Sequence, residues 1–220
     1  MLPARSVHRL EEWYRKMRVR LVRMRYGNPA KHLRVIAVTG TNGKTTTVNY
    51  LNEILKEAGY TTAMFSTATI EIAGQAKRND LNATVASTAT MQQFFRHAKK
   101  AHVDFVVMEF PSHAIHQHKL EGVPVEMAIM TNLTQDHLDY HKTMDAYAEV
   151  KSRLFAQNPK YIVLNRDDEW FKYFNAFPAQ AQKITYGEHA DAEAHIDRVK
   201  LYRKGTEAHI TIDHQTKLEL

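Results

Sequence analysis

A short segment rich in glycine, threonine and lysine carries the clearest chemical signal in this chain. Residues 40–46 read Gly-Thr-Asn-Gly-Lys-Thr-Thr and follow an apolar run at 35–38. Glycines at a strand-to-helix turn let backbone N–H groups approach phosphate oxygens, and the start of a helix attracts anions. Lys44 would neutralise the terminal phosphates and the Thr45 hydroxyl would bind Mg²⁺. The segment therefore predicts a nucleotide site, against the alternative of a glycine turn that only caps a helix.

The spacing of this loop departs from the common rule. A standard phosphate-binding loop has four residues between its first glycine and the Gly-Lys pair. Here only Thr41 and Asn42 separate Gly40 from Gly43. The shortened spacing raises the question of which nucleotide enzymes use it.

Two further groups of polar residues follow apolar runs. Glu109 ends the run 103–108, so its carboxylate is expected at the carboxyl edge of a sheet, where ligands bind in open α/β folds and where an acid can hold Mg²⁺. The alternative is an ordinary surface charge. Segment 131–141 brings Asp136, His137, Asp139 and His141 together. Because Mg²⁺ prefers oxygen ligands, the residues alone leave open whether these histidines bind a metal or are solvated.

The composition limits the chemistry and the class of protein. The chain has 220 residues, of which 44% are hydrophobic, and this suits one globular domain with a sizeable core. It contains no cysteine, so catalysis must rely on oxygen and nitrogen groups. No run of about 18 apolar residues and no apolar signal core is found, which predicts a cytoplasmic protein.

Alternating patterns predict the elements that position these residues. Short β-branched or apolar runs indicate strands, and longer amphipathic segments between them indicate helices. The expected strands are 34–39, 61–66, 103–109, 125–130 and 161–165, and the expected helices are 45–58, 88–100 and 143–156. This order predicts an α/β fold with a mostly parallel sheet and helices on both faces. Past residue 183, short alternating strands predict a small antiparallel β appendix near the C-terminus.

The first 33 residues form a separate basic arm in this reading. Residues 1–34 contain ten Lys or Arg and two Glu, a charge of +8, while the whole chain has +6, so residues 35–220 sum to −2. Apolar residues recur every three or four positions from Val7 to Met24, which predicts an amphipathic helix. Three interpretations stay open: packing on the body with solvated arginines, contact of residues 1–25 with a membrane surface or an anionic partner, and nucleic-acid binding. No nucleic-acid motif accompanies the charge, so nucleic acid is not expected.

Three blocks in fixed order resemble the central ATP-binding domain of the Mur ligases. They are GTNGKTTT at 40–47, MEFPSHAIHQHKLEGV at 108–123 and TNLTQDHLDYHKTMDAYAEVKSRLF at 131–155. The resemblance spans roughly residues 33–200 and is strongest to the branch that adds the third amino acid to UDP-N-acetylmuramoyl-dipeptide. In this family the shortened loop is the normal form. The domain is therefore expected at 34–220, as part of a ligase rather than an ordinary kinase.

The resemblance implies roles for individual residues. The ATP phosphates would be held by Gly40, Thr41, Asn42, Gly43, Lys44, Thr45 and Thr46. Mg²⁺ ligands would be Thr45, Glu109, His137 and Lys151, the last carbamylated, and Lys44, Lys151 and His137 would be catalytic. A carbamate supplies the hard oxygens that Mg²⁺ prefers, whereas a free ammonium would repel it. From the pattern alone, Lys151 reads as a solvated helix residue.

The implied activity is ATP-dependent amide formation in peptidoglycan precursor synthesis. The carboxylate of a UDP-muramoyl peptide would attack the γ-phosphate, and an amino acid would displace phosphate from the resulting acyl phosphate. The expected partners are therefore small molecules: ATP, a UDP-muramoyl peptide and an amino acid. The domains that bind the uridine nucleotide and the amino acid in this family have no counterpart in the sequence, so this chain alone is expected to be incomplete for turnover.

Substrate-binding positions depart from the family pattern. The usual Thr-Thr pair is Thr84-Val85 here, Ser-Ser-His is Pro111-Ser112-His113, and the expected arginine is Lys119. Lysine lacks the bidentate fork of arginine, so Thr84, Ser112 and Lys119 would bind the sugar-nucleotide end differently. Two alternatives stay open: a ligase resembling folylpolyglutamate synthase, and a nucleotide-binding module or pseudoenzyme without turnover.

Overall fold

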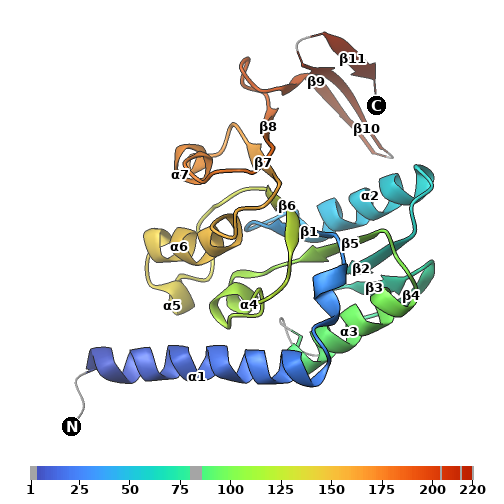
Figure 1. Cartoon of the computed structure of the whole chain (residues 1–220). Coiled ribbons are helices and arrows are strands. Elements are labelled where there is room, and N and C mark those ends of the chain that lie inside the picture. The colour runs from blue at the N-terminus through green and yellow to red at the C-terminus, as the bar shows by residue number, and fades with distance from the viewer. Residues whose placement is uncertain (1–3, 80–85, 204, 214, 220) are drawn as a thin grey trace.

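The described chain is built around one continuous β-sheet (Figure 1). The computed structural model describes residues 4–79, 86–203, 205–213 and 215–219. Within these residues the strand order is β11-β10-β9-β8-β7-β6-β1-β5-β2-β3-β4. The strands are β1 (Val35–Thr39), β2 (Thr62–Phe65), β3 (Thr69–Ile72), β4 (Gln75–Arg78), β5 (Phe105–Glu109), β6 (Val125–Met130), β7 (Tyr161–Asn165), β8 (Gln182–Gly187), β9 (Ala194–Tyr202), β10 (Gly205–Ile212) and β11 (Thr216–Glu219).

In the order of the sheet, the neighbouring strands β9-β8-β7-β6-β1-β5-β2 form its parallel part. β1 lies between β5 and β6 and pairs with both in parallel. β2 continues the parallel pairing on one side, and β7, β8 and β9 continue it on the other. The carboxyl ends of β1, β2, β5 and β6 therefore meet at one edge of the sheet, where a ligand site is expected in such folds.

Helices cover both faces of the sheet, as the alternating pattern predicts. The helices are α1 (Ala4–Arg25), η1 (Pro29–His32), α2 (Lys44–Glu57), α3 (Thr88–Lys100), α4 (Ser112–His116), α5 (Leu138–His141), α6 (Met144–Phe155) and α7 (Phe171–Asn175). Alternate β1 residues enter two separate cores: Ile36 and Val38 pack with Val48 of α2, while Val35 and Ala37 belong to the core that contains α3 and α6. Fully buried strands of this kind need apolar side chains on both faces, which explains their continuous apolar runs.

The expected strands and helices are confirmed to within a few residues, and the antiparallel appendix is present as β9, β10 and β11. The pattern analysis missed a second antiparallel piece, the β3–β4 hairpin at the opposite edge. Its turn, Ala73-Gly74, has positive φ at both residues, 49° and 80°. That is the backbone of a tight hairpin turn, and alternation in Thr-Ile-Glu-Ile before an Ala-Gly pair is the signal that was available.

Helix α1 packs on the body with a mixed side, on which Val19 and Glu12 lie, while most of its large apolar side chains face away. Val19 is buried at 3% exposure, and Arg20 Nε donates to Glu121 Oε1 at 2.9 Å. Figure 1 shows α1 as a long blue helix running beneath the rest of the molecule. The interpretation that α1 packs on the body is thus confirmed. Arg18, Arg20 and Arg25 are exposed, as expected for solvated arginines, and Arg20 in addition pairs with Glu121 of the body.

No helix among the described residues is long and apolar enough to cross a membrane. Helix α1 has the length, with 22 residues, but its basic side chains make it too polar to span a bilayer.

Candidate functional site

The loop between β1 and α2 closes against the end of β6. Gly40 has a φ of 149° and Gly43 a φ of 81°, and Gly43 caps the start of α2. Thr131, directly after β6, donates its hydroxyl to Asn42 O at 2.7 Å. A Cβ on Gly40 would lie 1.8 Å from Thr131 Oγ1. Glycine is therefore required here by close approach as well as by backbone conformation.

Gly40→Ala is expected to lower the free energy of unfolding by about 3 kcal/mol, because the new methyl group displaces Thr131 and adopts an unfavourable φ. Urea unfolding of both proteins measures this difference. Gly59→Ala is the matched control: Gly59 has a φ of +87° with nothing within 4 Å of an added Cβ, so it should cost only about 1 kcal/mol. Equal losses at both positions would contradict the close packing of the loop.

Two lysines converge on the same carbonyl of this loop. Lys44 Nζ donates to Gly40 O at 3.0 Å and to Thr41 O at 2.7 Å. Lys151, from the distant helix α6, donates to Gly40 O at 2.8 Å. The sequence placed Lys44 at the phosphates, but nothing in the helical pattern of 143–156 indicated that Lys151 would reach the same atom.

Lys151 is among the most buried polar side chains of the described chain, with 1% exposure. Burial lowers its pKa well below the ordinary value, and the neighbouring Lys44 lowers it further. Its Nζ also lies 4.6 Å above the ring of Tyr147. The prediction from pattern alone, a solvated residue, is wrong, because α6 turns this side chain inward toward the loop. The environment favours a neutral, nucleophilic amine.

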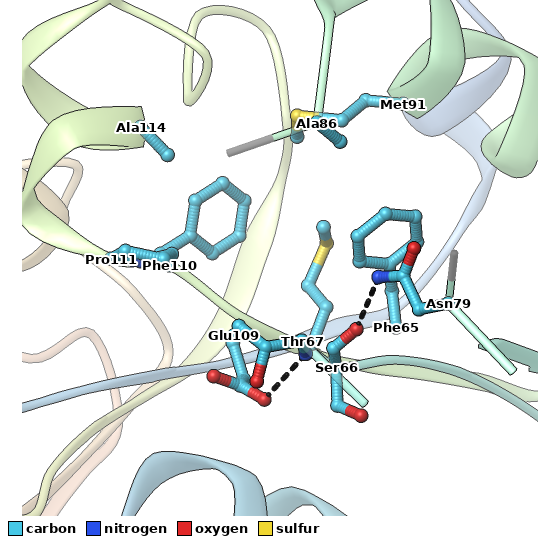
Figure 2. A pocket seen from close by; sticks show the side chains of 11 residues that line it. Phe65, Ser66, Thr67, Asn79, Ala86, Met91, Glu109, Phe110, Pro111 and Ala114 are labelled. Atoms are coloured by element: carbon cyan, nitrogen blue, oxygen red, sulfur yellow. Dashed lines mark hydrogen bonds between the residues drawn. The ribbon is translucent and has the colours of Figure 1, made fainter. Parts of the chain in front are cut away.

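Glu109 lies on the other side of the loop, at the end of β5. Its Oε1 accepts a hydrogen bond from Thr67 N at 2.9 Å, as Figure 2 shows, and Thr67 Oγ1 lies 3.2 Å from Thr45 Oγ1. Glu109 is 5% exposed, and its second oxygen, Oε2, is buried without a hydrogen-bond partner among the described residues. An unpaired buried carboxylate oxygen is suited to a cation, because such an oxygen is otherwise costly.

Histidines and aromatic rings pack together beyond the loop. The ring of His137 lies 5.1 Å from that of His113 and 6.4 Å from that of Tyr147. His137 Nε2 lies 3.4 Å from Asp136 Oδ2, and its side chain is 42% exposed. In the part of the chain that the structure describes, no three His, Asp or Glu side chains are already grouped to hold a metal. A metal that uses Glu109 and His137 therefore needs further ligands of other types.

Comparison with known proteins decides the family. A model of the Mur ligase middle domain matches residues 38–220. The chain belongs to the Mur ligase family. It is 38% identical over 200 residues to the UDP-N-acetylmuramoyl-L-alanyl-D-glutamate--2,6-diaminopimelate ligase of Bacillus velezensis, covering 87% of this chain and 40% of the relative. The enzyme of the same name from Bacillus licheniformis is 41% identical over 189 residues, 82% of this chain and 38% of that protein.

Solved structures agree with this assignment. A structure of a UDP-N-acetylmuramoyl-L-alanyl-D-glutamate--2,6-diaminopimelate ligase has a TM-score of 0.77 at 30% identity, covering 86% of this chain and 39% of that chain. Mycobacterium tuberculosis folylpolyglutamate synthase complexed with ADP and AMPPCP shares the fold, with a TM-score of 0.70 at 17% identity, over 88% of this chain and 51% of that one. The chain thus spans about 40% of the length of the curated relatives it matches.

Within this Mur ligase domain, two of the three predicted substrate residues lie on neighbouring elements. Ser112 begins α4 and is 2% exposed, and Lys119 follows α4 and is 6% exposed. Lys119 Nζ donates to Ala86 O, and burial lowers its pKa to about 8. Thr84 lies outside the described residues. Lys119 also lines a groove with Gln117, Tyr140 and Arg18 of α1. Sequence analysis did not single out this groove.

His141 holds Ser112 in place. Its Nε2 lies 2.9 Å from Ser112 Oγ, and its ring stacks on Tyr147 at 4.8 Å between centroids. Burial, together with the neighbouring His113 and His116, lowers the pKa of His141 to about 4. The imidazole therefore stays neutral at physiological pH and serves as a hydrogen-bond partner of the serine, not as a cation.

The low pKa of His141 predicts acid sensitivity. The unfolded chain binds the proton near pH 6.5 and the folded chain only near pH 4, so stability falls as the pH drops through this window. His141→Gln, which keeps a hydrogen-bonding side chain, is expected to remove about 1–2 kcal/mol of the acid destabilisation. Urea unfolding at pH 7 and pH 4.5 measures it, with His97→Gln at an exposed position of α3 as control. An unchanged pH dependence in His141→Gln would contradict the buried neutral ring.

Proposed function

We propose that this chain is the ATP-binding domain of an ATP-dependent amide ligase that acts on a UDP-muramoyl peptide in peptidoglycan precursor synthesis. The observation that carries the proposal is the convergence of Lys44 and Lys151 on Gly40 O, within a short-spaced phosphate loop of Mur type. Both relatives named above are amide-forming ligases by name. Two lysines, a buried glutamate and a helix start around one loop suit a triphosphate.

In this proposal the residues of the loop bind and orient ATP. The backbone N–H groups of residues 40–46 face the phosphates, and Lys44 leaves its two loop carbonyls to pair with the terminal phosphate oxygens. A carboxylate oxygen of the acceptor attacks the γ-phosphorus, the bond to ADP breaks, and an acyl phosphate forms. The amine of the incoming amino acid then forms the C–N bond as phosphate leaves and the amine proton passes to solvent. Lys44 stabilises the charge that develops during transfer.

The site fits Mg²⁺ in part. Thr45 and Glu109 would hold it, since Glu109 Oε2 is buried and unpaired and Thr67 contacts both residues, and His137 would be a further ligand. Bound there, Mg²⁺ would supply positive charge that offsets the negative charge of the phosphates.

We further propose that Lys151 is carbamylated. Its neutral amine would attack the carbon of CO₂, forming a C–N bond as one C–O π pair moves to oxygen and one proton leaves to solvent. The product is an anionic carbamate next to Lys44, so the repulsion between two lysines becomes an attraction. The lowered pKa of Lys151 supports this step, because only the unprotonated amine is nucleophilic.

The domain boundary, the substrate residues and the location are parts of the same proposal. Residues 1–33 would form an arm and residues 34–220 the catalytic domain. Thr84, Ser112 and Lys119 would contact the muramoyl peptide, with Arg18 of α1 adding a cation to the groove beside Lys119. The protein would work in the cytoplasm, with residues 1–25 directed to a membrane surface or another partner.

The experiment that tests the function is phosphate release from ATP by the protein. It should require both a UDP-muramoyl dipeptide and an amino acid, and mass spectrometry should find the new amide. ATP binding without phosphate release under any substrate pair, also after the remaining domains of a relative are supplied, would favour the nucleotide-binding module instead. Release driven by a folate and glutamate would favour the folylpolyglutamate-synthase-like alternative, for which the shared fold is the only specific observation.

A further inference from the structure

Helix α1 turns an apolar stripe away from the rest of the molecule. Its members lie within about 100° of each other around the helix and are largely exposed: Leu10 (56%), Trp13 (62%), Tyr14 (61%), Leu21 (61%) and Met24 (64%). At 3.6 residues per turn these positions lie on one side of the helix. We call these five residues the outer stripe. Scattered exposed apolar residues are ordinary, but a continuous row of this length marks an interaction surface.

Contacts on the opposite side of α1 fix the outer stripe in this orientation. Val19 is buried against the body, and Glu12 Oε2 lies 3.0 Å from His118 Nε2. Arg20 pairs with Glu121 at 2.9 Å. These contacts reach residues about a hundred positions away in the chain, so α1 cannot rotate to bury the stripe without breaking them.

Exposed basic side chains border the outer stripe. By helical spacing, Arg18 and Arg25 follow one long edge, and Arg20, which pairs with Glu121 of the body, follows the other. Long arginine side chains can lie along an apolar surface while their charged heads reach outward. An apolar row that contains Trp and Tyr, bordered by cations, is typical of a helix that lies in the interface of a membrane with anionic lipids.

We propose that the outer stripe docks α1 flat onto an anionic lipid surface. The charge argues against a second copy of this chain as the occupant, because two α1 helices face to face would bring together two segments of +6 each, eight Lys or Arg against two Glu. Docking would also hold the groove of Lys119, Arg18 and Tyr14 close to the lipid headgroups. The proposal does not depend on the ligase assignment, since lipid binding needs neither ATP nor substrate.

Co-sedimentation with vesicles of phosphatidylcholine plus phosphatidylglycerol, and with vesicles of phosphatidylcholine alone, tests this. The protein is expected to bind the anionic vesicles and to be released by high salt, which screens the attraction. Leu21→Ser/Met24→Ser is expected to weaken binding on the order of a hundredfold, because two side chains no longer leave water for the lipid. In a Trp170→Phe background, Trp13 is the only tryptophan, and its emission should shift to shorter wavelength on binding.

The matched control is Tyr50→Ser/Ile54→Ser on α2, whose side chains are as exposed (68% and 63%) but lie outside the stripe. It should bind like the wild type, and both variants should keep the wild-type circular dichroism. Binding that the stripe variant leaves unchanged would overturn the proposal, as would no binding to anionic vesicles. Self-association of the wild type without lipid would also overturn the proposal if the stripe variant loses it and the control variant keeps it. That result would indicate a second copy of the chain as the partner.

Discussion

Replacing Lys44 with alanine is expected to weaken the binding of ATP with Mg²⁺ by about a hundredfold, since hydrogen bonds between a lysine and phosphate oxygens each contribute about 1.5–3 kcal/mol. Lys44 begins α2 directly after Gly43, so its side chain lies over the loop. In the structure its Nζ is held by Gly40 O and Thr41 O, which places it where a phosphate would arrive. Burial lowers the pKa of Lys44, and Glu109 and Asp136 partly oppose this. A triphosphate would restore the full charge.

Isothermal titration of ATP with Mg²⁺ into wild type and Lys44→Ala measures this loss. Lys56→Ala is the control on the same helix, because Lys56 pairs with Glu53 and Glu71 at its far end. Its affinity should equal that of the wild type. Wild-type affinity in Lys44→Ala would show that the loop at 40–46 is not the phosphate site, whatever the family.

Lys151→Met is expected to stabilise the protein while abolishing turnover. At neutral pH in buffer free of CO₂, the free energy of unfolding should rise by about 1–3 kcal/mol, because an apolar side chain of similar length replaces a buried amine that lies near Lys44. Turnover should fall by about a hundredfold or more if a carbamate orients the metal. A gain of stability with a loss of activity is the mark of a functional site held in an unfavourable state.

The stability difference between Lys151→Met and the wild type should depend on pH in a direction set by the pKa of Lys151. The folded-state pKa of Lys151 lies below its ordinary value of 10.5, so between these two values the unfolded chain holds one more proton than the folded chain. Stability of the wild type therefore falls as pH drops below about 10.5, until the folded-state pKa is reached. The difference between Lys151→Met and wild type should be near zero at high pH and largest at low pH.

Urea unfolding at several pH values measures both effects. Lys119→Met is a positive control: Lys119 is also buried, and burial lowers its pKa to about 8, so its substitution should also give a gain that fades as the pH rises. Bicarbonate labelled with ¹³C should produce a carbamate carbon signal in the wild type and none in Lys151→Met. Destabilisation by Lys151→Met in CO₂-free buffer at neutral pH would contradict the description of Lys151 as a buried amine in an unfavourable environment.

Local sequence signals predicted part of this site because they depend on neighbouring residues. The loop at 40–46 combines glycines, a lysine and threonines within one turn, and Glu109 follows from the rule that parallel strands end at one edge. Lys151 is different. Its role depends on α6 pointing one side chain at Gly40 across 111 positions of sequence, and no helical period encodes this contact. Only the resemblance to the Mur ligases indicated it.

Helix α1 is a second element that the sequence alone predicted only in part. The recurrence of apolar residues correctly predicted an amphipathic helix, but periodicity does not say which face meets the body. Here Glu121 and His118, distant in sequence, provide partners for Arg20 and Glu12, and these contacts turn the apolar face outward. The β3–β4 hairpin was missed for a simpler reason: its turn uses Ala73 at positive φ, a conformation that alanine rarely signals.

A crystal structure of the protein with a non-hydrolysable ATP analogue and Mg²⁺ tests the central claim most directly. The account predicts the γ-phosphate within hydrogen-bond distance of Lys44 Nζ, with Mg²⁺ bound by Thr45 Oγ1 and Glu109 and with the Lys151 side chain beside it. A triphosphate bound elsewhere, or bound in the loop with Glu109 and Lys151 both turned away from the metal, would contradict it.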